Sequence, residues 1–328
     1  MTTPFTLNLQ VSDVDDLNPL IRRLVLRAPD GGPLPGFTAG SHIRVRVHLP
    51  SGANDWRHYS LVNFDTAPGA TRAPLDYTIA VRREDDGRGG SRFMHQLKAG
   101  EVLTVESPKN DFPLGSLNGA AVLIAGGIGV TPLISMAAER KREGQEVRMT
   151  YAGRTLELMA FVPELKTLLG SGLLLHSDQS AGTPLNVHGL LDSCAVDDVL
   201  YVCGPQLMLD TILTAAQARG WSPGRVRFEL FTAPSAQEGD HAFELVLKQS
   251  GKTLQVPADQ TILDCMVEHG CDALFDCKRG ECGICVANVL EGGVDHRDHV
   301  LTETEKASGK VIQVCVSRAK GGRLVLDL

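Results

Sequence analysis

Four cysteines near the end of the chain have a spacing that could hold a metal cluster. The stretch "CKRGECGIC" has the pattern C-x4-C-x2-C, and twenty-nine residues separate it from a fourth cysteine; the four are Cys277, Cys282, Cys285 and Cys315. This is the plant-type spacing for a [2Fe–2S] cluster with four thiolate ligands, whereas structural zinc usually takes two separated C-x2-C pairs. The pattern therefore favours iron–sulfur, with zinc as the main alternative.

The residues around these cysteines support the same interpretation. A loop that wraps a cluster needs positive φ angles, close backbone approach and N–H groups directed at the sulfurs, all of which Gly280 and Gly283 would permit. None of the eight cysteines lies in the first 193 residues, and six fall between 265 and 315. In a reducing compartment such a concentration is more often a metal site than a disulfide framework, which makes disulfides the weaker interpretation.

Two short motifs in the first third of the chain could bind a phosphorylated cofactor. In "RHYS", residues 57–60, the arginine could hold a phosphate, the tyrosine could pack on a cofactor ring and the serine could reach a flavin nitrogen. In "GRGGS", residues 87–91, we expect Ser91 to cap a short helix over 91–98 and free N–H groups to attract an anion. The alternatives are a surface arginine beside a buried tyrosine and a glycine-rich hairpin turn.

Two motifs in the middle of the chain could bind a nucleotide. "LIAGGIGVTP" predicts a strand that runs into a glycine turn and then a helix, with Thr131 as N-cap and Pro132 at the first helical position. Its glycines, Gly126, Gly127 and Gly129, would let a pyrophosphate approach the start of the helix. "VCGPQ" predicts that Cys203 and Gly204 lie at the carboxyl edge of a parallel sheet, where ligands bind. A buried strand with a tight turn, and a buried thiol, are the alternatives.

The pattern of the chain changes twice. Short alternating apolar runs such as "SHIRVRVHLP" recur over residues 5–114 and indicate an antiparallel barrel or sandwich. Strand and helix patterns alternate over 118–229, which indicates a parallel sheet covered by helices. A polar stretch of linker composition follows at 231–241. Beyond it we expect a hairpin, a helix that Thr261 caps, the cysteine loop and two final strands.

Bulk composition excludes several classes of function. The net charge of −7 argues against nucleic-acid binding, and aromatic residues, at 5%, are too sparse for base-stacking platforms. The longest apolar stretch, "AAVLIAGGIGV", is too short and too rich in glycine to span a bilayer. The first residues lack the basic region and apolar core of a secretory signal, so we expect a cytoplasmic location.

Taken together the motifs resemble those of the phthalate dioxygenase reductase family, which includes vanillate demethylase reductases. The resemblance extends over the whole chain and rests on "RHYSL", "IAVRRE", "GRGGS", "AGGIGVTP", "YVCGP", "DHRDHVLTE" and "VCVSRAKGGRLVLDL". It implies a multidomain protein with four consecutive parts. These are an FMN-binding antiparallel β-barrel domain over 1–114, an NAD(H)-binding α/β parallel-sheet domain over 115–230, a linker over 231–240 and an α+β plant-type ferredoxin domain with a [2Fe–2S] cluster over 241–328.

The resemblance also implies roles for individual residues. FMN would be held by "RHYS" and by the phosphate-binding glycines: Arg57, His58, Tyr59, Ser60, Gly89, Gly90 and Ser91. NADH would be held by the middle motifs: Gly126, Gly127, Gly129, Thr131, Cys203 and Gly204. Ser60 would lie near the reactive flavin nitrogen, Cys203 near the nicotinamide, and Phe231 would pack on the isoalloxazine ring. The chain departs from the family at Asp276, where serine is common, and at Thr232, where glycine is usual.

The function that the resemblance implies is electron transfer from NADH through FMN and a [2Fe–2S] cluster to a Rieske-type oxygenase. The order of the parts fits the chemistry, because NADH gives an electron pair, the cluster accepts single electrons and a flavin can do both. We expect a monomer whose substrates are NADH and a partner protein. The alternatives are a reductase for another acceptor, such as a haem protein, and a non-catalytic iron–sulfur carrier or redox sensor.

Overall fold

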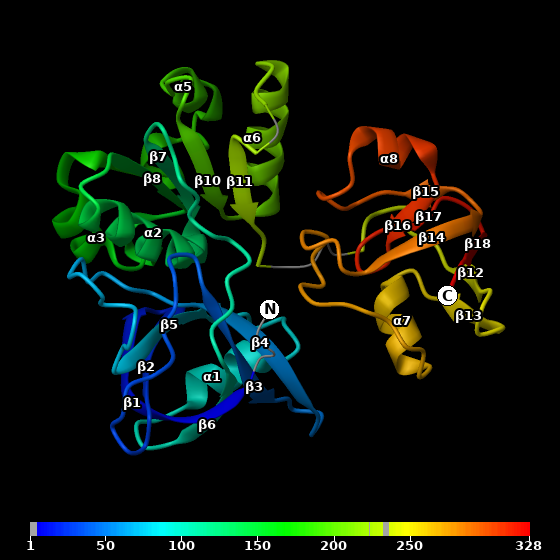
Figure 1. Ribbon diagram of the computed structural model, residues 1–328, viewed down its shortest axis with the longest axis horizontal. Helices are drawn as coiled ribbons and strands as arrows, with labels where there is room; N and C mark the ends of the chain where they lie inside the picture. The colour runs from blue at the N-terminus through cyan, green and yellow to red at the C-terminus, as the bar shows by residue number, and fades with distance from the viewer. Residues whose placement is uncertain (1–4, 223, 232–235) are drawn as a thin grey trace. The chain divides into compact units, whose positions relative to one another are not determined.

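The computed structural model describes residues 5–222, 224–231 and 236–328. Its contacts divide the chain into two compact units, Met1–Glu229 and Leu230–Leu328, which are described separately below. The first unit contains an antiparallel and a parallel sheet, and the second contains a small mixed sheet (Figure 1). These sheets confirm the predicted fold class. No described helix is long and apolar enough to cross a membrane.

The antiparallel sheet of the first unit has six strands in the order β4-β3-β6-β1-β2-β5. In β3 the apolar residues Ile43, Val45 and Val47 are buried and alternate with more exposed arginines, as the period of a strand with one core-facing side requires. The short helix α1 follows β5. The strands and the helix are β1 (Thr6–Asn18), β2 (Ile21–Arg27), β3 (His42–His48), β4 (Asn54–Ser60), β5 (Asp76–Arg82), β6 (Val102–Glu106) and α1 (Gly90–Gln96).

The second sheet of the first unit has five parallel strands in the order β11-β10-β7-β8-β9. Every residue of its central strand, β7, is buried, which is usual for a parallel strand covered on both faces. The strands are β7 (Ala121–Gly126), β8 (Val147–Gly153), β9 (Leu173–Ser177), β10 (Val199–Cys203) and β11 (Val226–Glu229). The main helices are α2 (Val130–Arg142), α3 (Val162–Leu169), α5 (Val187–Asp192) and α6 (Gln206–Ala218), with one further turn, α4 (Asp178–Ala181).

The two sheets of the first unit share one hydrophobic core. Val62 and Phe112 from the antiparallel part pack in the same cluster as Val130 and Ile134 of α2. The hydroxyl of Ser135, also on α2, donates a hydrogen bond to a backbone carbonyl of the antiparallel part. The shared core explains why residues 5–229 behave as a single compact unit although they contain two kinds of sheet.

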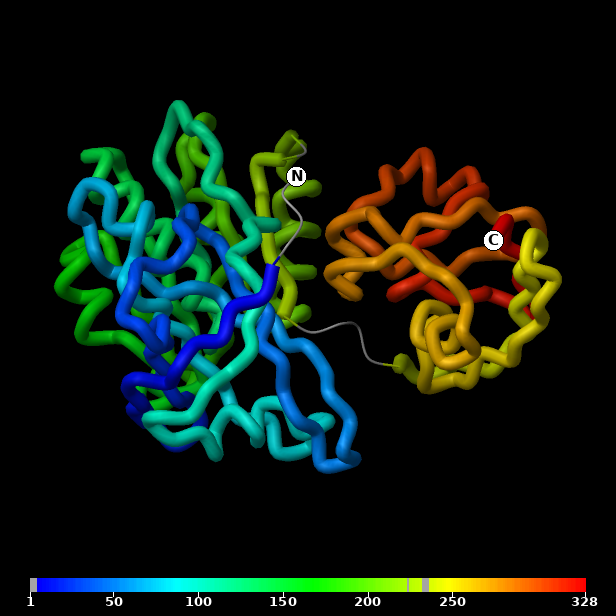
Figure 2. The backbone as a smooth tube through the Cα atoms, turned by 60° about the horizontal axis from the view of Figure 1, so that its bottom comes forward, coloured from blue at the N-terminus to red at the C-terminus, as the bar shows by residue number. Residues whose placement is uncertain are grey.

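The second unit is a mixed sheet in the order β13-β12-β18-β14-β16, with a two-stranded ribbon of β15 and β17. Thr261 caps α7 as predicted, because its hydroxyl accepts a hydrogen bond from the N–H of Asp264 at 3.0 Å. The strands are β12 (Phe243–Leu247), β13 (Lys252–Val256), β14 (Val286–Glu291), β15 (Val294–Asp295), β16 (Val311–Gln313), β17 (Arg318–Ala319) and β18 (Arg323–Leu326). The helices are α7 (Ile262–Glu268) and α8 (Glu303–Ser308). Figure 2 follows the backbone from α7 through the cysteine-bearing segment to β14.

Candidate functional site

The four cysteines of the predicted cluster site lie together in the second unit as two thiol pairs. Cys277 and Cys282 form one hydrogen-bonded pair, and the sulfurs of Cys285 and Cys315 are 2.9 Å apart. All eight cysteines of the chain are free thiols. Within the described residues no three His, Cys, Asp or Glu side chains converge on one ion position, so the arrangement is two pairs. Two pairs of thiolates are the donor set that the two irons of a [2Fe–2S] cluster need.

The backbone of residues 276–285, which we call the cluster loop, is shaped to surround these sulfurs. Lys278, Gly280 and Gly283 all have positive φ angles, of 56°, 76° and 76°. The loop can therefore turn its N–H groups inward, and the N–H of Arg279 donates to the sulfur of Cys277 at 3.3 Å. This is the geometry that the sequence predicted for the two glycines. N–H groups directed at sulfur stabilise thiolate and tune the potential of a cluster.

Hydrogen bonds within each pair separate the acidities of its two thiols. The thiol of Cys282 and then backbone N–H groups lower the pKa of Cys277 to about 5, and the same hydrogen bond raises the pKa of Cys282. In the second pair, the Cys315 thiol lowers the pKa of Cys285, and the pKa of Cys315 rises. One thiol of each pair is thus held ready to be a thiolate. Thiolate is the form of cysteine that binds metal.

Two charged residues of the cluster loop are nearly buried, a feature that the sequence analysis did not identify. Arg279 and Glu281 have side chains that are 8% and 15% exposed, and they form an ion pair of 3.2 Å. Asp276, the departure from the family pattern, is half-buried at the start of the loop. Gln313 was also missed, and its side-chain oxygen accepts a hydrogen bond from the thiol of Cys285 at 3.2 Å. Its position two residues before Cys315 was the available signal.

In the first unit the structure brings the two predicted flavin motifs together. Arg57 lies on β4, and its side chain covers Gly90, where a Cβ atom would come within 2.9 Å of the arginine Nε. Gly89 has φ of 101° and has no room for a Cβ beside Pro50. Glycine at position 90 lets the Arg57 side chain pack directly on the backbone, and glycine at position 89 lets the turn pass close to Pro50. In this structure the guanidinium of Arg57 pairs with the carboxylate of Asp55. A guanidinium beside backbone N–H groups is a donor set that suits a phosphate, so the residue types present would fit the phosphate of FMN, and their role stays a prediction.

The predicted cap of the helix after these glycines was wrong. Helix α1 begins at Gly90, and Gly89 occupies the N-cap position. The hydroxyl of Ser91 instead accepts a hydrogen bond from the backbone N–H of Glu84 at 3.0 Å. Ser91 therefore ties the glycine turn back to the segment after β5. The positive φ of Gly89, which glycine adopts readily, allows the helix to begin at Gly90, one residue before the predicted start at Ser91.

The other "RHYS" residues differ in exposure. Ser60, at the end of β4, is buried, whereas His58 is half-buried and packs edge-on against His42 with ring centroids 4.9 Å apart. Tyr59 packs against the core of the antiparallel sheet, and burial raises the pKa of its hydroxyl. Tyr59 therefore stays neutral over the physiological range. The predicted roles of these three residues toward FMN stay predictions.

The predicted nucleotide motifs also meet, at the carboxyl edge of the parallel sheet. Strands β7 and β10 are parallel neighbours, with Ala125 opposite Cys203. A Cβ atom at Gly129 would overlap the carbonyl oxygen of Cys203, and one at Gly126 would lie 2.5 Å from Pro205. Two of the glycines are therefore required because the turns after β7 and β10 touch. Only Gly127, with φ of 55° and nothing within 4 Å of a Cβ, leaves open space.

Two details of this edge differ from the sequence prediction. Thr131 is not an N-cap: α2 begins at Val130 after a short 3₁₀ turn, and the buried Thr131 hydroxyl donates to the carbonyl of Ile128 at 3.0 Å. Cys203 does end β10 as predicted, but its side chain is buried. Gly204 packs against Gly126 in the adjacent turn. The roles of Thr131, Cys203 and Gly204 toward NADH stay predictions.

Phe231 is the last residue that the structure describes before residue 236. Its side chain is 36% exposed, so an aromatic face is available for packing. Thr232, the second departure from the family pattern, lies outside the described residues. The packing of Phe231 on a flavin ring stays a prediction.

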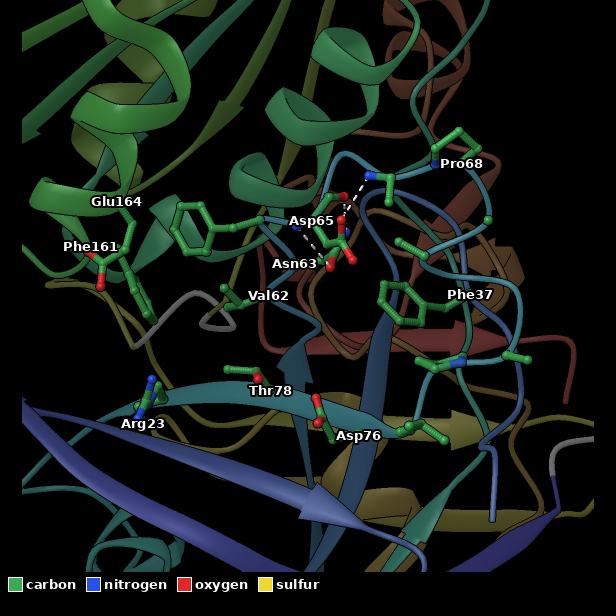
Figure 3. A pocket seen from close by; sticks show the side chains of 17 residues that line it. Arg23, Phe37, Val62, Asn63, Asp65, Pro68, Asp76, Thr78, Phe161 and Glu164 are labelled. Carbon is green, nitrogen blue, oxygen red and sulfur yellow. Dashed lines mark hydrogen bonds between the residues drawn. The ribbon is translucent and has the colours of Figure 1, made fainter. Parts of the chain in front are cut away.

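A cavity of about 570 Å³ in the first unit contains none of the predicted site residues. Figure 3 shows Phe37, Val62 and Thr78 of the antiparallel part facing Phe161 and Glu164 at the start of α3. Carboxylates are prominent in its lining: Asp65, Asp76 and Glu164. Arg23 lines the same cavity, so charges of both signs face it.

Comparisons with known proteins agree with the chemistry of the cysteines. A family model described as the 2Fe-2S iron-sulfur cluster binding domain matches residues 245–320, which include all four cluster cysteines. The chain is 43% identical to a putative toluene-4-sulfonate monooxygenase system reductase subunit from Comamonas testosteroni, over 93% of each chain. It is 38% identical to the heme-dependent oxidative N-demethylase beta subunit of Ectopseudomonas mendocina, over 98% of this chain and 99% of that one.

A solved structure is similar over almost the whole chain. It is phthalate dioxygenase reductase, described as a modular structure for electron transfer from pyridine nucleotides to [2Fe–2S]. The identity is 34%, the TM-score is 0.73, and the match covers 98% of each chain.

Proposed function

This chain belongs to the phthalate dioxygenase reductase family, and from that membership we propose that it is the NADH-dependent reductase component of a Rieske-type oxygenase. It is an oxidoreductase of the electron-transfer type, with a [2Fe–2S] domain, a flavin and NAD(H). In the proposal electrons pass from NADH through FMN and the cluster to the oxygenase. The observation that carries it is the arrangement of four cysteines as two thiol pairs, with three of the four in the cluster loop, where the N–H of Arg279 donates to the sulfur of Cys277.

A bound flavin would take up the electron pair of a hydride and release the electrons one at a time, and the protein would supply its position. Arg57 and the backbone at Gly89 and Gly90 would hold the phosphate of FMN, which the close packing of the Arg57 side chain on Gly90 supports. Ser60 would donate its hydroxyl to the flavin edge, and Phe231 would cover the ring. Tyr59, whose pKa burial raises further above neutral pH, would add an uncharged wall.

The nucleotide would bind where β7 and β10 end. Gly127 supports this, because its turn is open while the neighbouring glycines are closed by packing. Cys203 and Gly204 would form the floor under the nicotinamide, and Thr131 would stabilise the turn through its bond to Ile128. No described residue among these is arranged as a general base or a nucleophile for an organic substrate, which leaves hydride transfer as the reaction.

An anaerobic titration of the purified protein with NADH tests the proposal. We expect flavin bands on a broad iron–sulfur background, and both should bleach as NADH is added. FMN rather than FAD is identified by extracting the flavin and measuring its mass. A protein without flavin, or one whose spectrum NADH does not change, would favour the non-catalytic carrier and overturn the reductase.

A haem protein is the second candidate for the electron acceptor. The relative from Ectopseudomonas mendocina is a subunit of a heme-dependent oxidative N-demethylase and matches this chain over nearly its full length. The test compares reduction rates of a Rieske oxygenase and of a haem protein under the same conditions. Faster reduction of the haem protein would replace the Rieske partner in the proposal.

We also propose that the protein works as a monomer in the cytoplasm. The eight free thiols support a reducing compartment. Light scattering on the purified protein would test the oligomeric state, and a dimer mass at micromolar concentration would contradict the monomer.

A further inference from the structure

Glu281 lies immediately before the cluster cysteine Cys282, and its side chain is nearly buried. One carboxylate oxygen, Oε2, faces Nε of Arg279 at 3.2 Å. Removing a charge from water costs free energy unless the charge is paired and hydrogen-bonded. A carboxylate at this position therefore needs partners. Binding of a cluster by the four cysteines does not by itself require an acidic residue at position 281.

The second carboxylate oxygen of Glu281 makes a contact that explains why an acidic residue is needed there. Oε1 accepts a hydrogen bond from the backbone N–H of Leu230 at 2.6 Å. The two residues are 51 positions apart in the sequence, and Leu230 is buried. Leu230 is also the first residue of the second unit and the neighbour of Phe231. The segment that carries Phe231 is therefore fastened to the residue beside a cluster ligand.

A second fastening holds the other end of the segment predicted as a linker. Asp240 accepts a hydrogen bond from Nη1 of Arg297 at 3.0 Å, and its side chain is 7% exposed. Nε of Arg318 is 3.8 Å from the same carboxylate. Among the described residues, both flanks of 231–240 are thus bonded within the second unit. The described residues on the two flanks, Leu230 and Asp240, are therefore bonded to residues of the second unit.

We propose that Glu281 is a positioning residue that holds the Phe231 segment against the cluster loop, so that Phe231 and the cluster move as one body. The proposal rests on the proposed function, in which Phe231 packs on the flavin. The bonded connection runs from Phe231 through the N–H of Leu230 to Glu281 and on to Cys282. Loss of the anchor leaves reduction of the flavin by NADH unchanged and slows the later reduction of the cluster.

Two substitutions separate the hydrogen bond from the charge. Glu281→Gln keeps an oxygen that can accept from Leu230 but removes the charge, whereas Glu281→Ala removes both. Both variants alter the electrostatics beside Cys282 in the same way, so both shift the cluster potential similarly. If reduction of the cluster is slow in the alanine variant and not in the glutamine variant, the cause is therefore the position of the Phe231 segment and not the reduction potential of the cluster.

The test is anaerobic stopped-flow mixing of the full-length holoprotein with NADH, followed at flavin and cluster wavelengths. In Glu281→Ala the cluster phase should slow by about tenfold, the factor expected for losing one hydrogen bond to a charged group. Glu281→Gln should remain within about threefold of the parent protein, since a neutral hydrogen bond is weaker by that order. The flavin phase should be the same in all three proteins.

A readout independent of activity is amide hydrogen exchange at Leu230, which should become faster in Glu281→Ala. Glu303→Ala is the matched control, because Glu303 lies on α8 with a side chain 86% exposed. Should Glu281→Ala fail to hold its cluster, Leu230→Pro removes the N–H donor without changing a residue of the cluster loop, and the same slow cluster phase is expected. Because Leu230 is buried, Leu230→Ala, which keeps the N–H, is the control for loss of the side chain. An unchanged cluster phase in Glu281→Ala or in Leu230→Pro, or unchanged exchange at Leu230 in Glu281→Ala, would overturn the anchor. A parent protein whose flavin NADH does not reduce would instead overturn the proposed function.

Discussion

The turn after β7 and the cluster loop both depend on glycine, but for different physical reasons. In the turn, Gly126 and Gly129 have ordinary φ angles of −119° and −62°, and a Cβ is excluded because the turn after β10 fills the space. In the cluster loop, Gly280 and Gly283 have φ of 76°, a backbone angle that residues other than glycine rarely adopt. The first region uses glycine to pack, and the second uses it to turn N–H groups inward.

Removing a cluster ligand should have the largest effect. Cys315→Ala takes one thiol from a pair, and we expect the iron content to fall from about two atoms per chain to nearly none. Elemental analysis and the visible spectrum measure this and also separate iron from zinc. Cys265→Ala is the control, because Cys265 is buried in the same unit but belongs to neither pair. Retention of iron by the Cys315 variant would contradict the assigned ligand set.

Gly129→Ala should break the packed turn. Its Cβ would overlap the backbone of Cys203, which cannot move without disturbing β10, so we expect a loss of about 3 kcal/mol in the free energy of unfolding. Both tryptophans, Trp56 and Trp221, lie in the first unit, so denaturant titration followed by their fluorescence reports this unit. A loss under about 1 kcal/mol would show that the two turns are not in tight contact.

Gly280→Ala should affect the cluster loop by a sum of two causes. Its φ is unfavourable for alanine, and the Cβ would lie 2.8 Å from a methyl carbon of Val316, so we expect about 2 kcal/mol of destabilisation. Cluster absorbance during denaturant titration measures it. Gly251→Ala is the matched control in the same unit, since φ is 69° there but no atom is within 4 Å. Equal effects in the two variants would mean that the crowding at Gly280 is relieved at no cost.

Asp240→Asn should change how the second unit responds to acid. The hydrogen bond from Arg297 is the main reason why the pKa of Asp240 lies below the ordinary carboxyl value of 3.8. A lowered folded-state pKa stabilises the fold at neutral pH, and this stabilisation is lost as the pH falls below the ordinary value. At pH 7 we expect the variant to be less stable by between about 1 and 2 kcal/mol.

The measurement for Asp240 is differential scanning calorimetry of the second unit's transition at pH 7 and at about pH 3, below the ordinary carboxyl value. The gap between parent and variant should narrow at the lower pH. Asp295→Asn is the control, because Asp295 also pairs with Arg297 but its side chain is 40% exposed. A gap that stays constant with pH would show that ionisation of Asp240 does not contribute.

The sequence predicted local features well where a short stretch determines them. Thr261 caps α7 because its own hydroxyl reaches three residues ahead, and the buried strand β7 follows from a continuous apolar run. The cysteine spacing likewise identified the four thiols that meet as pairs. In these cases the physical cause lies within a few residues of the effect.

The predictions failed or were incomplete where the cause lies far away in the sequence. The hydroxyl of Ser91 bonds the N–H of Glu84 and does not cap α1, and the contact of Gly129 with Cys203 arises only after two strands pair. The Leu230–Glu281 bond spans 51 residues. Strand β9 has half-exposed residues without a clear alternation, so no pattern marked it. Tertiary contacts decide these features, and a single sequence does not display them.

Gly127→Ala should have the smallest effect on stability and distinguishes the two uses of glycine within one turn. Gly127 has φ of 55° and no neighbour within 4 Å, so alanine should cost about 1 kcal/mol through its backbone alone. If the open space receives a nucleotide, the Kd for NADH should also rise, because the new methyl group occupies that space. Gly144→Ala bears the same backbone cost, with φ of 66° and equally open surroundings, but lies outside the turn. Equal NADH affinity in both variants, measured by flavin-reduction titration, would mean that the turn after β7 is packed for the fold and not shaped for a ligand.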